Sequence, residues 1–394
     1  MAIYLDHAAT TPLRPEALEA MLPYLTERFG NPSSPHRFGR AARAGLDEAR
    51  ERLAARLNAE PRELVFTSGG TEANNLAVKG AAWVGKARGN QILTSPVEHH
   101  SVGHSLAYLE KFGFEVVALG VDRYGRVDPD EVEARLGDRT ILVSIMLANN
   151  EVGTIEPIAE IARRVRTRRG VLFHVDAVAA APHLPLDVQA LDVDLLTLSA
   201  HKFEGPKGAG LLYIRRGVHI LAQQQGGTQE RYRRAGTEDV AAVVGMAVAY
   251  DLACEERATV SGRLRRAADR LLRTLRAEPG VEVTGHPKER LPGLVSVVVP
   301  GVDGAELVMA LDLAGIAVST GSACTTGSTE PSHVLTAMGY PADEARGALR
   351  ISLGRATTEA ELETAAAEIR AVIARFRAAA ESEPALAQDG VLGR

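Results

Sequence analysis

The chain has 394 residues, of which 45% are hydrophobic and 24% charged, and these proportions are typical of a globular enzyme with room for two domains. Its net charge of −5 gives no overall positive field, so nucleic acid is not expected as the main partner. No apolar stretch reaches the roughly 18 residues that cross a bilayer, so no membrane segment is expected. The chain has only two cysteines, and residues 1–7 lack the pattern of a secretory signal, so we expect a cytoplasmic protein.

Short apolar runs alternate with amphipathic stretches over the first two thirds of the chain, a pattern that predicts an α/β fold with a mainly parallel sheet. Helices are predicted over 15–26, 41–57 and 72–84. Strands are predicted over 63–67, 91–94, 115–118, 140–145, 171–176 and 193–198, and 211–214 is expected to return beside the last of them as a hairpin partner.

The pattern changes near Arg257, where an arginine-rich helical stretch begins. Helices over 263–276, 305–313 and 358–379 and a strand over 293–299 indicate a smaller α+β unit. We therefore expect a large domain over 14–256, a small domain formed by 1–13 and 257–380, and a loose tail over 381–394.

Two strands of the expected sheet end in groups suited to pyridoxal 5'-phosphate. Lys202 follows the run 193–198, amid small and polar residues, and a lysine in that place suits a Schiff base with an aldehyde. Asp176 ends the preceding strand, and a carboxylate there can keep a pyridine nitrogen protonated. A solvated loop lysine is the alternative for Lys202 taken alone.

Several loops carry groups that could complete such a site. Gly70 and Thr71 lie between a strand and a helix, where backbone N–H groups can bind a phosphate, although Thr71 could simply cap the helix. Ser199 and His201 could add donors to the phosphate. His99, in a loop over 96–101, could stack on a pyridine ring and supply an acid/base nitrogen, or it could be a solvated or capping histidine.

Two further polar groups follow or interrupt apolar runs. Asn150 follows the strand 140–145 and could donate to a phenolate oxygen or a carboxylate. Arg350 lies within the apolar run 348–353, where its charge needs a partner. That partner is either the α-carboxylate of an amino-acid substrate or an acidic side chain in a salt bridge between domains.

The two cysteines differ in their surroundings. Cys324 lies among small and polar residues over 319–328, as expected for an exposed, reactive thiol on a loop. Cys254 lies in a helical stretch and is predicted to be a half-buried structural residue.

With these residues considered, the chain resembles the cysteine desulfurases of iron–sulfur cluster assembly, in the class V aminotransferase superfamily of fold-type I enzymes. The matching segments follow the family order over 4–12, 30–34, 67–75, 98–100, 149–153, 174–177, 199–202, 236–237 and 321–324. The loop that ends in Ser322-Ala323-Cys324 resembles the first group of these enzymes.

The resemblance implies roles for the matching positions, with no metal. Lys202 would carry the cofactor, Asp176 would pair with its pyridine nitrogen, and His99 would stack on its ring. The phosphate would be held by Gly70, Thr71, Ser199, His201 and, from a second subunit of a homodimer, Thr237. Asn31, Asn150 and Arg350 would hold the substrate carboxylate or the phenolate side of the cofactor, and Cys324 would accept sulfur. Ala179 departs from the family, which usually has a glutamine there that donates to the phenolate oxygen.

The function implied is conversion of L-cysteine to L-alanine with transfer of sulfur to Cys324, and then to an acceptor or iron–sulfur scaffold protein. A selenocysteine lyase or an aminotransferase of the same fold is the alternative enzyme. A transaminase needs no exposed cysteine, so Cys324 favours the desulfurase. The third alternative is a sulfur-trafficking partner that has lost catalysis, with Ala179 as an early lesion.

Overall fold

The computed structural model describes residues 2–321 and 331–388, and its centre is a seven-stranded sheet. Its strands lie in the order β2 (Leu64–Thr67), β8 (Gly210–Ile214), β7 (Leu195–Ser199), β6 (Leu172–Asp176), β5 (Thr140–Ser144), β3 (Gln91–Thr94) and β4 (Glu115–Ala118). Only β8 runs against its neighbours β2 and β7, and the other pairs are parallel. The expected α/β fold with a mainly parallel sheet, and the pairing of β8 with β7, are confirmed.

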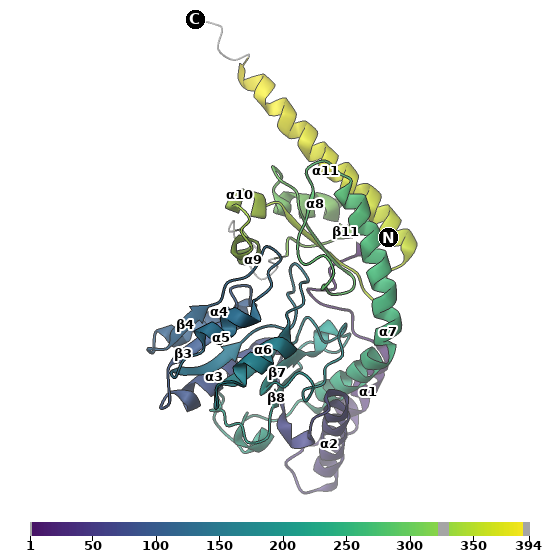
Figure 1. Ribbon diagram of the computed structural model, residues 1–394. Coiled ribbons are helices and arrows are strands. Elements are labelled where there is room, and N and C mark those ends of the chain that lie inside the picture. Colours follow the sequence, from purple (N-terminus) through teal and green to yellow (C-terminus); the bar gives the residue numbers. More distant parts are fainter. Residues whose placement is uncertain (1, 322–330, 389–394) are drawn as a thin grey trace, which may run out of the picture.

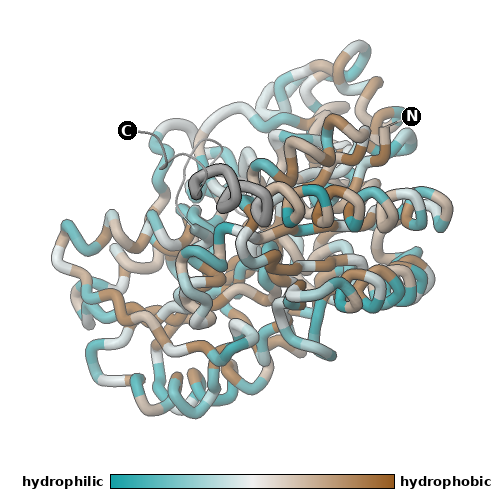
Figure 2. Tube along the Cα trace, turned by 90° about the horizontal axis from the view of Figure 1, so that it is seen from above, coloured by the Kyte–Doolittle hydropathy of each residue, from teal (hydrophilic) through white to brown (hydrophobic). Residues whose placement is uncertain are grey.

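Helices cover both faces of this sheet, because alternate side chains of each strand point to opposite sides. Val65 and Leu212 pack with α3 (Gly70–Gly85) and α4 (His100–Glu110). Phe66 and Leu211 pack on the other face. The helices that contribute to the core there are α1 (Pro15–Thr26), α2 (Arg37–Leu57), α5 (Pro129–Arg135), α6 (Ile158–Val165) and the first part of α7 (Val240–Arg276). The strands appear as hydrophobic segments inside the molecule in Figure 2.

A second core lies around two small sheets. The first pairs β1 (Ile3–Tyr4) with β11 (Ile316–Ala317), and the second has the order β12 (Ala348–Ser352), β10 (Leu294–Val298), β9 (Glu282–Val283). The accompanying helices are α8 (Gly304–Leu313), α9 (His333–Ala337), α10 (Ala342–Ala345) and α11 (Glu359–Gln388). The pairing of β1 with β11 joins the N-terminal segment to the C-terminal third of the chain (Figure 1).

Helix α7 runs through both cores. Met246 packs in the core of the large sheet, whereas Leu271 packs in the second core. The boundary expected near Arg257 therefore lies inside a continuous helix of 37 residues rather than in a linker (Figure 1). The division into domains stays a prediction.

The ends of several elements differ from the sequence prediction. Helix α2 begins at Arg37 rather than at 41, because His36 caps it by accepting a hydrogen bond from the Gly39 N–H. Helix α11 continues to Gln388, into the expected loose tail, through a stretch rich in alanine and glutamate, which favour helices. The loop expected over 96–101 ends at His99, where α4 begins. Each helix of the described residues is too short or too polar to cross a membrane.

Candidate active site

The predicted site residues from β6 and β7 meet at the carboxyl edge of the sheet. Asp176 ends β6, Ser199 ends β7, and Lys202 ends the short 3-10 helix η2 (Ala200–Lys202) that follows. Parallel neighbouring strands bring their carboxyl ends to the same edge, where ligands of α/β folds bind. All three residues line one cavity, of about 400 Å³, together with residues of the small sheets' unit such as Arg350.

Asp176 is buried, and its carboxylate is held by two donors. One oxygen accepts from the Asn74 side-chain amide at 2.7 Å, and the other accepts from the Val178 N–H at 2.9 Å. The Asn74 amide also donates to the Ser101 hydroxyl at 2.8 Å. Each carboxylate oxygen has two lone pairs, so Asp176 keeps acceptor capacity toward the cavity that it lines.

The Lys202 ammonium group lies against the N-terminal segment. Its Nζ donates to the carbonyl oxygens of Ala8 and Ala9, at 2.5 and 2.9 Å. The same segment is bound to η2 by the Thr11 hydroxyl, which donates to the His201 carbonyl at 2.8 Å. Lys202 is therefore a held residue on the cavity wall, and the solvated-loop alternative is wrong.

The N-terminus of α3 faces the same cavity. Gly69 precedes it with φ of 149° and gives no side-chain cap to the first N–H groups of the helix. A Cβ at Gly70 would lie 2.9 Å from Val178 Cγ2 and 3.3 Å from Ser199 Cβ. Uncapped N–H groups at a helix N-terminus favour an anion, and Gly70 leaves room for one.

Two histidines beside this region are neutral. His99 caps α4, and its Nδ1 accepts from the Ser101 N–H at 3.1 Å, so the neutral ring carries its proton on Nε2. Burial lowers the pKa of His99, although the Asp176 carboxylate opposes this shift. Burial, and then the Lys202 charge, lower the pKa of His201 to about 4.

Arg350 lines the cavity from β12 and is 2% exposed. Its guanidinium forms an ion pair with Asp6 at 2.9 Å and donates to the Asn150 carbonyl at 2.9 Å. Its Nε has no hydrogen-bond partner within the described part of the chain. The structure therefore shows the salt bridge that the sequence left open, and it also places Arg350 and Asn150 on the cavity wall.

Two predicted residues do not lie at this cavity within one described chain, and a third is not described. Asn31 is exposed, and its side-chain oxygen accepts from the Ser33 N–H. Thr237 is also exposed, and neither residue lines the cavity. Cys324 lies outside the described residues. Cys254 is half-buried in α7, as predicted, and burial raises the pKa of its thiol.

Sequence reasoning assigned no role to three residues that hold the site. Asn74 and Ser101 brace Asp176, and Asp6 pairs with Arg350. Asn74 lies four residues after Gly70 and shares a face with it in α3, but the predicted helix began at 72 and so did not reveal this.

Comparisons with known proteins agree with this geometry. The profile of the family "Aminotransferase class-V" matches residues 3–364. The chain is 48% identical to "Cysteine desulfurase IscS" of Methanosarcina thermophila, over 95% of this chain and 93% of the relative. It is 47% identical to the protein of the same name from Dictyoglomus turgidum, over 95% of each chain.

Solved structures resemble the whole fold. A structure titled "NIFS-LIKE PROTEIN" has a TM-score of 0.90 at 38% identity and covers 95% of this chain and 100% of its own. One titled "SspA in complex with cysteine" has a TM-score of 0.77 at 34% identity and covers 89% of this chain and 98% of its own.

Proposed function

This chain belongs to the class-V aminotransferase family, and from that premise we propose that it is a cysteine desulfurase that uses pyridoxal 5'-phosphate. The observation that carries the proposal is the placement of Lys202 and Asp176 on one cavity, at the ends of adjacent parallel strands, with the N-terminus of α3 on the same cavity. A lysine, a buried carboxylate and a phosphate site are the three elements that this cofactor needs.

The residues present fit the cofactor. Asp176 has two donors and spare acceptor capacity, as a carboxylate facing a protonated pyridine nitrogen needs. Gly70 gives the clearance that a phosphate at the α3 N-terminus needs. The group would be held by residues that line the cavity, with Thr237 supplied by a second subunit. These residues are Lys202, Asp176, His99, Asn150, Gly70, Thr71, Ser199 and His201. When bound, the group accepts the electron pair left at Cα of an amino acid.

The protein's own residues would move protons and orient the substrate. Lys202 Nζ would take the proton from Cα of L-cysteine. His99, neutral with its proton on Nε2, would stack on the ring of the cofactor and keep that proton, donating from Nε2 as a hydrogen bond. Arg350 would bind the substrate α-carboxylate with the Asp6 carboxylate as its resting partner.

Sulfur would leave the substrate for Cys324. The Cβ–S bond of L-cysteine breaks, a new S–S bond forms at the Cys324 sulfur, and Cβ gains a proton. The sum is L-cysteine and a thiol converted to L-alanine and a persulfide, with no other oxidant or reductant. Cys254, which is half-buried and has a raised pKa, is a poor competitor for this role.

We also propose the setting in which the enzyme works. The exposed apolar side chains of Leu18, Leu22 and Leu25 on α1 support a homodimer. The persulfide would pass to a sulfur-acceptor or iron–sulfur scaffold protein. The small number of cysteines suits the reducing cytoplasm.

The test follows sulfur and alanine with purified holoenzyme. L-Cysteine should yield alanine, and a trapped persulfide should lie on the peptide with Cys324. Cys324→Ser should abolish the persulfide and keep the first spectral change, whereas Cys254→Ala should act like the wild type. Borohydride should fix the cofactor to Lys202. Keto-acid products with an amino-acid acceptor would instead indicate an aminotransferase, and persulfide on Cys254 would reverse the two cysteines.

A further inference from the structure

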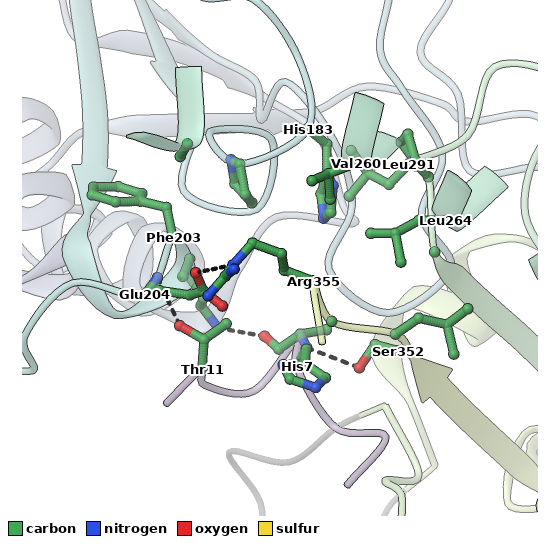
Figure 3. Close-up of a pocket in the computed structure, with 18 of the residues that line it drawn as sticks. His7, Thr11, His183, Phe203, Glu204, Val260, Leu264, Leu291, Ser352 and Arg355 are labelled. Carbon is green, nitrogen blue, oxygen red and sulfur yellow. Dashed lines mark hydrogen bonds and ion pairs between the residues drawn. The ribbon is translucent and has the colours of Figure 1, made fainter. Parts of the chain in front are cut away.

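A second cavity adjoins the candidate active site, and Ala8, Asn150, Ala179 and Lys202 line both. It lies between the N-terminal segment, the residues after η2, the middle of α7 and the end of β12 (Figure 3). None of the steps proposed above uses it. Its volume is about 90 Å³. A dry cavity of about 150 Å³ is known to take up benzene, so this smaller cavity suits a ligand smaller than benzene.

One side of this cavity is apolar. Val260 and Leu264 from α7 face it together with Leu291, and they lie on one side of the view in Figure 3. Apolar side chains that line a preformed cavity favour an apolar group as its occupant.

The other side carries charges with a positive excess. Arg14 pairs with Glu204 at 3.0 Å and with Glu256 at 2.5 Å, and Arg355 also pairs with Glu204, at 2.9 Å. Arg257 lines the cavity as well, and its Nη2 contacts the Cys254 sulfur rather than a carboxylate. Arg14 also pairs with Glu16 at 3.9 Å, so Arg257 is the guanidinium group of this wall that pairs with no carboxylate in the described part of the chain, and a negative charge beside it would balance this side.

Four residues of the cavity wall have a buried nitrogen without a hydrogen-bond partner among the described residues. The atoms are Arg14 Nη1, Arg257 Nε, His7 Nδ1 and His183 Nδ1. Arg14 is 2% exposed, and burial lowers the pKa of His183 to about 4, so the ring is neutral. Buried polar groups are normally paired, and the two guanidinium nitrogens can only donate, so they lack an acceptor, whereas each imidazole Nδ1 donates or accepts according to its tautomer.

We propose that this cavity binds a small aliphatic carboxylate, with its hydrocarbon end against Val260 and Leu264 and its carboxylate toward Arg257 and Arg14. The carboxylate supplies both the negative charge and the acceptor oxygens that the wall lacks. The apolar side disfavours an inorganic anion, and the volume excludes a large ligand.

An occupant would also act on Lys202. The carbonyls of Ala8 and Ala9 accept from Lys202 Nζ, and the Ala8 N–H donates at 2.8 Å to the Ser352 hydroxyl, whose residue lines the second cavity. A ligand packed on Ser352 would hold this segment in place, so Lys202, once the substrate has freed it from the cofactor, would stay on its carbonyl acceptors. The ligand would therefore lower turnover, an effect that rests on the function proposed above.

Binding can be measured on the holoenzyme by calorimetry with propanoate, and compared with its neutral amide. The carboxylate should bind saturably, and the amide about tenfold or more weakly, because it lacks the charge. Val260→Phe fills the apolar side and Arg257→Met removes a donor, and each should weaken binding by about tenfold or more. Ala258→Phe and Arg273→Met, at exposed positions of the same helix, are the matched controls and should bind like the wild type.

Three results would overturn the site. The first is the absence of saturable binding of propanoate, which would mean that water alone fills the cavity. The second is binding that Val260→Phe and Arg257→Met both leave unchanged. The third is displacement by L-cysteine, which would place the ligand in the active site. These results do not depend on turnover, so they are separate from a failure of the proposed function.

The effect on Lys202 has its own readout. Saturating propanoate should lower kcat by about fivefold or more in the wild type and leave it unchanged in Val260→Phe, whose basal kcat should be near that of the wild type. Calorimetric binding without any change in kcat would overturn the coupling to Lys202.

Discussion

Arg350 forms an ion pair with Asp6 in this structure, and in the proposed reaction it would bind the carboxylate of the substrate. It is almost fully buried, and an ion pair with one carboxylate leaves its Nε without a partner in the described residues. Asp6 is more exposed than Arg350, at 19% against 2% of the side chain.

Arg350→Ala should therefore raise the KM for L-cysteine. Loss of a charge-assisted contact costs on the order of 2–4 kcal/mol, or roughly 30- to 1,000-fold in KM. Steady-state kinetics of the folded variant, checked by cofactor absorption, give the measurement. Arg346→Ala, an exposed neighbour, should leave KM unchanged. A KM unaltered in Arg350→Ala would leave only the structural salt bridge.

Lys202 and Asp176 could be predicted from the sequence because apolar strand residues lead directly to each of them. Asp6 could not, because its partner lies 344 residues away and neither local pattern nor spacing records that contact. Asn74 was hidden for a similar reason, since its contact with Asp176 joins a helix to a strand 102 residues later. The reactive residues could be recognised from their neighbours in the sequence, whereas the residues that hold them in position come from distant parts of the chain.

Among the elements, the N-terminus of α3 has little room for a larger side chain at Gly70. The space above Gly70 is bounded by Val178 and Ser199, and a phosphate would need that clearance. Gly70→Ala should weaken pyridoxal 5'-phosphate binding by about 1–3 kcal/mol, roughly 5- to 150-fold, because the added methyl group overpacks the site. Titration of apoenzyme with the cofactor measures this loss.

The matched control for Gly70→Ala is Gly103→Ala in α4. An added Cβ at Gly103 meets nothing within 4 Å, so this variant should bind the cofactor normally and be slightly more stable. Equal affinity in Gly70→Ala and the wild type would mean that no phosphate group lies at the start of α3.

Element prediction succeeded where the pattern was long or strongly marked. Helix α1 was found in full, with proline at its first position. Helices α4, α5 and α6 were missed, because at 7 to 11 residues they present too few turns for periodicity to stand out. The continuity of α7 was missed because its first half is apolar and its second half arginine-rich, so one helix resembles two segments.

At the scale of the whole molecule, one face of α1 exposes large apolar side chains. Leu18, Leu22 and Leu25 are 45%, 48% and 58% exposed, whereas Ala17 of the same helix is buried. Leu22→Glu should shift a homodimer toward monomers and lower turnover, because Thr237 of the partner subunit would be lost from the phosphate site. Sedimentation measures the assembly, and Val84→Glu, also 48% exposed but on α3, should leave the mass unchanged. A monomeric wild-type enzyme with full activity would contradict this assembly.

Glu156 makes the stability of the fold depend on pH. One carboxylate oxygen accepts from the Val127 N–H at 2.9 Å, the other has no partner among the described residues, and burial raises the pKa of Glu156 to about 8. Because the folded pKa lies above the ordinary value of 4.5, the folded chain holds a proton that the unfolded chain releases between these two values. The free energy of unfolding should therefore fall as pH rises through this window, by up to about 1.4 kcal/mol per pH unit, and fall no further above pH 8 on account of this group.

Glu156→Gln keeps the acceptor for Val127 and cannot ionise, so its free energy of unfolding should change less between pH 5.5 and pH 7.5 than that of the wild type, by roughly 1–2.5 kcal/mol. Urea unfolding of the cofactor-bound protein at these pH values gives the comparison. Glu160→Gln, at an exposed position of α6, should keep the wild-type slope. If the slopes of wild type and Glu156→Gln coincide, Glu156 is ionised in the folded protein, and its buried oxygen must then have found a donor, because an unpaired carboxylate in this core would cost several kcal/mol.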